Sequence, residues 1–121
     1  MLRLLTVASS IAEVTQNLTG LPLYPNLRSA TMYGTPTTDT LGHWCTRLVG
    51  GSSDSLDAVQ AWYRKVLVGA SETDLTHDPS YQAYSDLSGI KLSMGLDYVD
   101  IYKGARQAST SIVLVKCSPR K

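Results

Sequence analysis

The stretch SSDSLDAVQAWYRKVLVGA, residues 52–70, is the most informative part of this chain for its fold class. Its serine and aspartate oxygens can accept hydrogen bonds from the unpaired amides of a helix start, and Asp57 adds favourable charge in the first turn. Apolar side chains then recur at helical intervals. We therefore predict an amphipathic helix from about Ser55 to Ala70, ending near Gly69, whose apolar stripe packs on a sheet. The stripe consists of Leu56, Val59, Tyr63, Val66 and Leu67.

Short apolar segments divided by turn-forming residues fill the last third of the chain, which is typical of a meander of strands. The polar stretch 72–79, which ends in proline, is predicted to be a loop before that meander. Residues 112–115 are continuously apolar, so we expect a central strand that is covered on both faces. The strands of the meander are predicted at 81–84, 89–94, 98–102 and 109–117.

Two further strands are predicted ahead of the helix. Leu27–Tyr33 can form a strand that ends in a threonine-rich turn, and Gly42–Val49 can form another that Gly50–Gly51 closes. The segment Leu21–Pro25, here called the proline segment, lacks two backbone donors and should be extended rather than part of a sheet. The sequence thus predicts an α+β fold, an antiparallel sheet of about five or six strands with one main helix packed on one face.

The length of 121 residues fits a single domain. Residues 21–121 are predicted to form that domain. Residues 1–20 are expected to be a separate N-terminal segment, either a short helix within Leu4–Leu18 or the remnant of a targeting sequence.

The charge balance argues against a nucleic-acid partner. Eleven Lys and Arg against ten Asp and Glu give a formal net charge of +1, without the basic footprint that neutralises phosphates. No apolar run is long enough to span a membrane as a helix. We expect no transmembrane segment and no cofactor.

The two cysteines, Cys45 and Cys117, match no spacing for zinc, iron–sulfur or thioredoxin-like chemistry. If both lie in strands, a disulfide would join the last strand to an early one, which suits export. Two buried thiols would suit the cytosol equally well. Both alternatives are open from the sequence, although the low charge and the many Ser, Thr and Tyr residues favour export to the periplasm or beyond.

The proline segment, followed by residues 53–67, resembles a broad group of small, mostly uncharacterised bacterial domains. Members of that group have a Pro-x-Tyr-Pro motif ahead of a strand and an Asp-Ser-x-x-x-Val-x-x-(Trp/Phe)-Tyr helix, and many are periplasmic or lipid-anchored. This chain has Asn26 and Leu27 where glycine and alanine are typical. The resemblance covers about half of the chain and implies the same fold and an exported protein.

A competing resemblance is to the glyoxalase-like metal-binding fold. A histidine in a strand, His43, and a helix containing Trp62–Leu67 are similar to one module of that fold. The polar stretch 72–79 adds further donors for a metal. The alternative function is therefore a small metal-dependent enzyme or metal-binding protein that uses His43 and His77, with Asp74 as a further ligand.

Tyrosines supply seven of the nine aromatic residues. On one strand, alternate residues Tyr98, Asp100 and Tyr102 should project from the same face, with Tyr81 and Tyr84 nearby. Tyrosine provides wide apolar contact, a polar tip and little side-chain entropy to lose. We therefore expect a non-enzymatic, exported binding or accessory domain that contacts a protein partner, or a second copy of itself as a dimer, through this face.

Overall fold

The computed structural model describes residues 21–38, 44–78, 81 and 86–118 of the chain. The short helix and targeting remnant expected within residues 1–20, together with His43 and Tyr84, lie outside these residues. The elements in chain order are β1 (Arg28–Thr38), β2 (Trp44–Ser52), α2 (Leu56–Val66), β3 (Ser71–Asp74), the 3-10 turn η1 (Leu75–His77), β4 (Leu87–Met94), β5 (Asp97–Gly104) and β6 (Thr110–Ser118).

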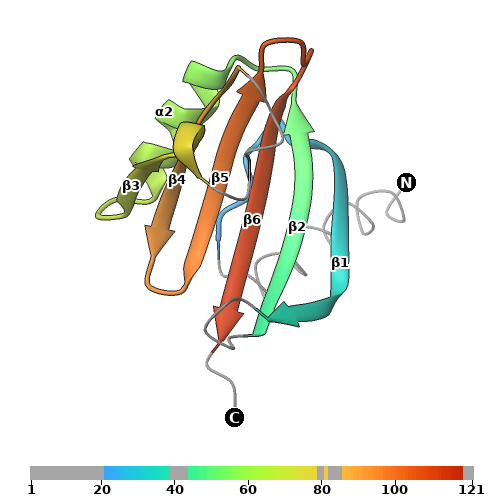
Figure 1. Ribbon diagram of the computed structural model, residues 1–121, viewed down its shortest axis with the longest axis vertical. Coiled ribbons are helices and arrows are strands. Elements are labelled where there is room, and N and C mark those ends of the chain that lie inside the picture. Colours follow the sequence, from blue (N-terminus) through green and yellow to red (C-terminus); the bar gives the residue numbers. More distant parts are fainter. Residues whose placement is uncertain (1–20, 39–43, 79–80, 82–85, 119–121) are drawn as a thin grey trace.

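The described strands form one antiparallel sheet, which confirms the α+β class (Figure 1). The order across the sheet is β1-β2-β6-β5-β4-β3. The strands β3 to β6 form the meander, and the other edge of β6 pairs with β2. The strand expected at 81–84 is not present at Tyr81, which lies outside every strand, and 82–84 lie outside the described residues. The expected central position of the last strand is confirmed, because β6 lies between β2 and β5.

Helix α2 begins where the sequence predicts. Ser55 is the N-cap, and its hydroxyl accepts a hydrogen bond from the amide of Ala58 at 3.1 Å. The helix ends at Val66, earlier than expected, because Leu67 leaves the helical backbone range and Gly69 reverses the chain at a φ of 87°. Val66 is 41% exposed and Gln60 is buried in its place, so this part of the predicted stripe is wrong.

Strands β1 and β2 are both longer than predicted. β1 runs through the expected turn to Thr38, because an edge strand tolerates Pro36 and two register shifts take up its extra residues. β2 continues through Gly50 and Gly51. A Cβ at Gly50 would lie 2.7 Å from Cδ1 of Leu27, so this glycine permits close packing inside the strand instead of ending it.

Two elements replace the loop predicted at 72–79. β3 pairs with β4 at the sheet edge, and all four of its side chains are exposed. Its polar composition concealed it, since an edge strand with a solvated surface needs no apolar alternation. Glu72 of β3 accepts two hydrogen bonds from the Arg64 guanidinium of α2, at 2.8 and 3.0 Å.

The main core joins α2 to one face of the sheet, here called the helix face. The helix contributes Val59, Tyr63 and Leu67 to the same buried cluster as residues of four strands. Leu21 and Tyr24 of the proline segment complete this cluster. The strand residues of the cluster are Leu48, Ile90, Leu92, Val99, Ile101, Ile112 and Leu114.

The proline segment contacts α2 and the residue just before it. The hydroxyl of Tyr63 donates to the carbonyl oxygen of Pro22 at 3.0 Å, and the rings of Tyr24 and Tyr63 stack at 6.2 Å. Tyr24 also donates to the carboxylate of Asp54, just before the helix, at 2.5 Å. These residues therefore hold the proline segment against α2.

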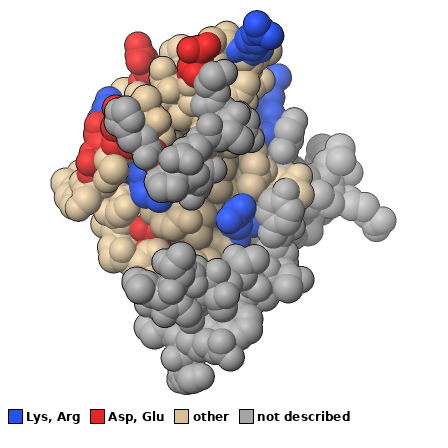
Figure 2. All heavy atoms as spheres, in the orientation of Figure 1, with Lys and Arg blue, Asp and Glu red and all other residues tan. Residues whose placement is uncertain are grey.

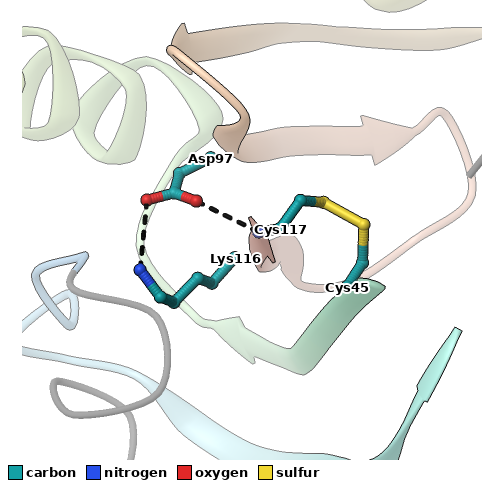
Figure 3. The surroundings of a disulfide bond; sticks show 4 residues. All are labelled: Cys45, Asp97, Lys116 and Cys117. Atoms are coloured by element: carbon teal, nitrogen blue, oxygen red, sulfur yellow. Dashed lines mark hydrogen bonds and ion pairs between the residues drawn. A yellow bond between two sulfur atoms is a disulfide. The ribbon is translucent and has the colours of Figure 1, made fainter. Parts of the chain in front are cut away.

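The opposite side of the sheet holds a smaller buried cluster that contains the disulfide. Cys45 of β2 and Cys117 of β6 are directly opposed in register and are bonded in the structure (Figure 3). The amide of Cys117 donates to Oδ1 of Asp97 at 3.1 Å, and the other oxygen of Asp97 pairs with Lys116 at 3.9 Å. The bond therefore joins two neighbouring strands that are far apart in sequence.

Candidate functional site

The sheet face opposite the helix face, here called the tyrosine face, contains a pocket of about 330 Å³. Tyr98, Asp100 and Tyr102 alternate along β5, so all three side chains project to this side. The connection between η1 and β4 brings Tyr81 over the same pocket. The floor is apolar and consists of Val49, Val113 and Val115.

Strand register explains how these groups meet. Tyr98 lies opposite Val115 of β6, and Asp100 lies opposite Val113. On the other side of β5, Asp100 lies opposite Lys91 of β4. On this face the side chains of β5 carry polar tips and those of β6 are small and apolar, so the pocket has an apolar floor beside a polar wall.

The tyrosine side chains at one end of the pocket depend on a glycine. Tyr102 lies opposite Gly89 of β4, where a Cβ would lie only 2.5 Å from Cβ of Tyr102 and 2.5 Å from the carbonyl oxygen of Ile101. The absence of a side chain at Gly89 therefore lets Tyr102 approach β4. The rings of Tyr102 and Tyr81 are 4.7 Å apart and tilted by 56°.

Asp100 is the unusual group of the pocket. Asp100 is only 4% exposed, and its Oδ2 accepts a hydrogen bond from the hydroxyl of Tyr81 at 2.7 Å. Its Oδ1 is buried and has no hydrogen-bond partner within the described part of the chain. A buried polar atom left without a partner costs about 1–3 kcal/mol, so it is rarely retained without a reason.

Burial changes the acid–base properties of this group of residues. It raises the pKa of Asp100 above the ordinary aspartate value, despite the opposing effect of the Tyr81 hydrogen bond. Burial also raises the pKa of Tyr81, and the hydrogen bond from Tyr81 to Asp100 raises it further. The pKa of Tyr98 is raised first by burial and then by the charge of Asp100. The tyrosines therefore remain neutral hydroxyl groups at physiological pH.

Two basic residues line the pocket with different surroundings. Lys91 forms an ion pair with Asp78 at 3.5 Å, and its Nζ lies 4.5 Å from the centre of the Tyr98 ring. Arg47 of β2 is exposed, and the structure shows no ion pair for it among the described residues. Neither residue was among those expected at this site from the sequence, although their alternation with buried neighbours could have placed them on this face.

The disulfide lies on the same face of the sheet, beside the apolar floor of the pocket. Cys45 and Cys117 belong to one buried cluster with Val113 and Val115, against which Tyr98 and Tyr102 pack. The covalent link therefore joins β2 and β6, the two strands that provide the valines of the pocket floor. Local sequence patterns indicated the cysteines and the tyrosines separately, but their proximity depends on strand order.

Of the residues proposed for a metal site, Asp74 has a local capping role in the described structure. Oδ1 of Asp74 accepts hydrogen bonds from the amide and the hydroxyl of Thr76, at 2.8 and 2.6 Å, which caps η1. His77 is the last residue of η1, and His43 lies outside the described residues. Among residues 21–38, 44–78, 81 and 86–118, no three His, Cys, Asp or Glu side chains are grouped to hold a metal.

A second hollow, of about 370 Å³, lies where β1 meets the end of β2. The described residues that line it are mainly glycine and serine, and Arg28 is the only charged residue among them. Ser52 is buried there, but its hydroxyl already accepts a hydrogen bond from the amide of Asp54 at 3.1 Å. Within its described lining, this hollow therefore has no buried polar atom without a hydrogen-bond partner. Oδ1 of Asp100 is such an atom in the pocket on the tyrosine face, here called the tyrosine pocket.

Charge on the face drawn in Figure 2 is mixed among the coloured residues. Figure 2 shows basic and acidic side chains near one another, and the coloured residues of this view form no broad area of one sign. None of the described helices is long and apolar enough to cross a bilayer. Comparison with protein-family models, curated proteins and solved structures found no match for this chain.

Proposed function

We propose that the chain is a non-enzymatic, exported binding domain that contacts a protein partner through its tyrosine face. The observation that carries this proposal is the grouping of Tyr81, Tyr98, Tyr102 and Asp100 around one pocket. Three of these are aromatic residues with polar tips, the type that is enriched where proteins bind one another. The face on the other side of the sheet is used for the core with α2 and is not free for a partner.

The disulfide supports export. Such bonds persist in oxidising compartments and are uncommon in the cytosol of most organisms. The cysteines are buried, at 8% and 7% exposure for Cys45 and Cys117, which suits a permanent structural bond. The resemblance of the proline segment and residues 53–67 to domains that are often periplasmic points the same way.

The size of the pocket limits what can enter it. A volume of about 330 Å³ is at the lower end of the range of about 300–1,000 Å³ for small-molecule sites. One side chain of a partner fits such a volume better than a large cofactor does. The surrounding face then provides the wider contact area that a protein interface requires.

Site-specific photo-crosslinking in an extract of the source cells tests this function. In one variant a photoreactive phenylalanine analogue replaces Tyr98 on the tyrosine face. In the matched control variant the same analogue replaces Ala61, which is exposed on α2. We expect one predominant protein adduct from position 98 and none of the same mass from position 61. An adduct with a second copy of this chain would identify self-association instead of a separate partner. Equal adduct yields at the two positions would overturn the proposal.

A further inference from the structure

We propose that the tyrosine pocket recognises a basic side chain, the guanidinium of arginine or the ammonium of lysine, presented by the protein partner. This inference rests on the proposed function, because it names the group that enters the same pocket. Three features carry it: the buried carboxylate, the aromatic rings and the distribution of charge around the pocket.

The carboxylate of Asp100 provides an acceptor for such a group. One of its oxygens accepts from Tyr81, while the other is buried and has no donor among the described residues. A positively charged N–H group is the strongest donor that a protein partner can offer to a carboxylate. Such a group, once inserted, would give Oδ1 of Asp100 the hydrogen bond that it lacks among the described residues.

The tyrosine rings add a surface that favours cations. Lys91 already demonstrates this, because its Nζ lies 4.5 Å from the centre of the Tyr98 ring while pairing with Asp78 at 3.5 Å. The faces of aromatic rings attract ammonium and guanidinium groups electrostatically, and more strongly where water is excluded. The planar guanidinium of arginine can in addition stack on a tyrosine ring, so arginine is the preferred occupant.

The charges around the pocket also favour a cation over an anion. Lys91 is neutralised by its ion pair with Asp78. Arg47 is exposed, so water and salt screen its charge, whereas Asp100 is only 4% exposed and its charge is screened much less. Among the described residues that line the pocket, the carboxylate of Asp100 is therefore the acidic group whose charge is least screened by water.

A titration with defined probes tests the inference without knowledge of the partner. The probe is arginine blocked at both ends as N-acetyl-arginine methylamide, and its neutral match is the citrulline analogue, which has a similar shape. Binding is followed by NMR chemical-shift changes of the oxidised protein. We expect shifts at Tyr98, Tyr102 and Lys91 with the arginine probe, and affinity at least about tenfold lower with citrulline, because charged hydrogen bonds are about twice as strong as neutral ones.

Three variants locate the binding group. Asp100→Asn should lower the affinity for the arginine probe by at least about tenfold. Asp57→Asn, an equal change of charge at an exposed position on α2, should leave it unchanged. Lys91→Met removes the resident cation next to Tyr98 and should strengthen binding, so the sign of its effect tests the proposal even if Asp100→Asn does not fold.

Each opposite result overturns the inference. Equal affinity for arginine and citrulline would exclude recognition of charge, and tighter binding of a blocked glutamate probe would assign the pocket to anions through Arg47. Weaker binding by Lys91→Met would likewise exclude a cation site beside Tyr98. These results are distinguishable from failure of the proposed function, because adducts at position 98 would still establish a partner-binding face that recognises some other group.

Discussion

Breaking the disulfide should remove about 4 kcal/mol of the free energy of unfolding. The bond joins residues 72 positions apart, which enclose α2 and the strands β3 to β5. Closure of a loop of this length lowers the entropy of the unfolded chain by about 15 cal/mol/K, or about 4 kcal/mol at about 25 °C. Small domains have only about 5–15 kcal/mol in total, so the reduced protein should be marginally stable.

Urea unfolding followed by far-ultraviolet circular dichroism, with and without reductant, measures this loss. We expect the midpoint of the reduced protein to fall by at least about 1 M urea, and its melting temperature by about 15–30 °C. The double variant Cys45→Ala/Cys117→Ala is the control and should show one stability under both conditions. Oxidised and reduced proteins that differ by less than about 1 kcal/mol would rule out loop entropy as the source of the stabilisation.

Two further predictions concern a tyrosine and a glycine. The hydrogen bond to Asp54, and then burial, raise the pKa of Tyr24 to about 12. The contribution of this hydrogen bond to stability is therefore present below about pH 10 and is lost as the pH rises through about 12. Unfolding of the wild type and of Tyr24→Phe at both pH values measures this loss. The same pH dependence for the two proteins would contradict the prediction. Gly89→Ala should displace Tyr102 and lower the crosslinking yield at position 98 by at least about tenfold. Ser88→Ala is the control and should leave that yield unchanged. Unchanged NMR signals of Tyr102 and Tyr81 in Gly89→Ala would contradict the predicted displacement.

Local signals were sufficient where the physical cause is local. The start of α2 depends on Ser55 and on neighbouring side chains within one turn, so it was correctly predicted. The continuous apolar run in β6 correctly indicated a central strand, because each of its faces meets a separate buried cluster. Alternation along β5 likewise identified Tyr98, Asp100 and Tyr102 as neighbours on one face.

Other features depended on partners that local patterns do not reveal. β3 was missed because its side chains are exposed and its strand conformation comes from pairing with β4. Gly50 was interpreted as a strand end, whereas it allows Leu27 to approach the backbone. The helix was predicted too long, since its end depends on how Leu67 turns into the core.

Periodicity and capping act over a few residues, so they were enough to establish the fold class, the main helix and the set of tyrosines on β5. Long-range packing, in contrast, brings Tyr81 to Asp100, places Lys91 over Tyr98, and joins the cysteines beside the pocket floor. Those contacts require the order β2-β6-β5-β4, which places distant segments side by side. Strand order follows from the packing of the whole chain, and no local pattern carries that information.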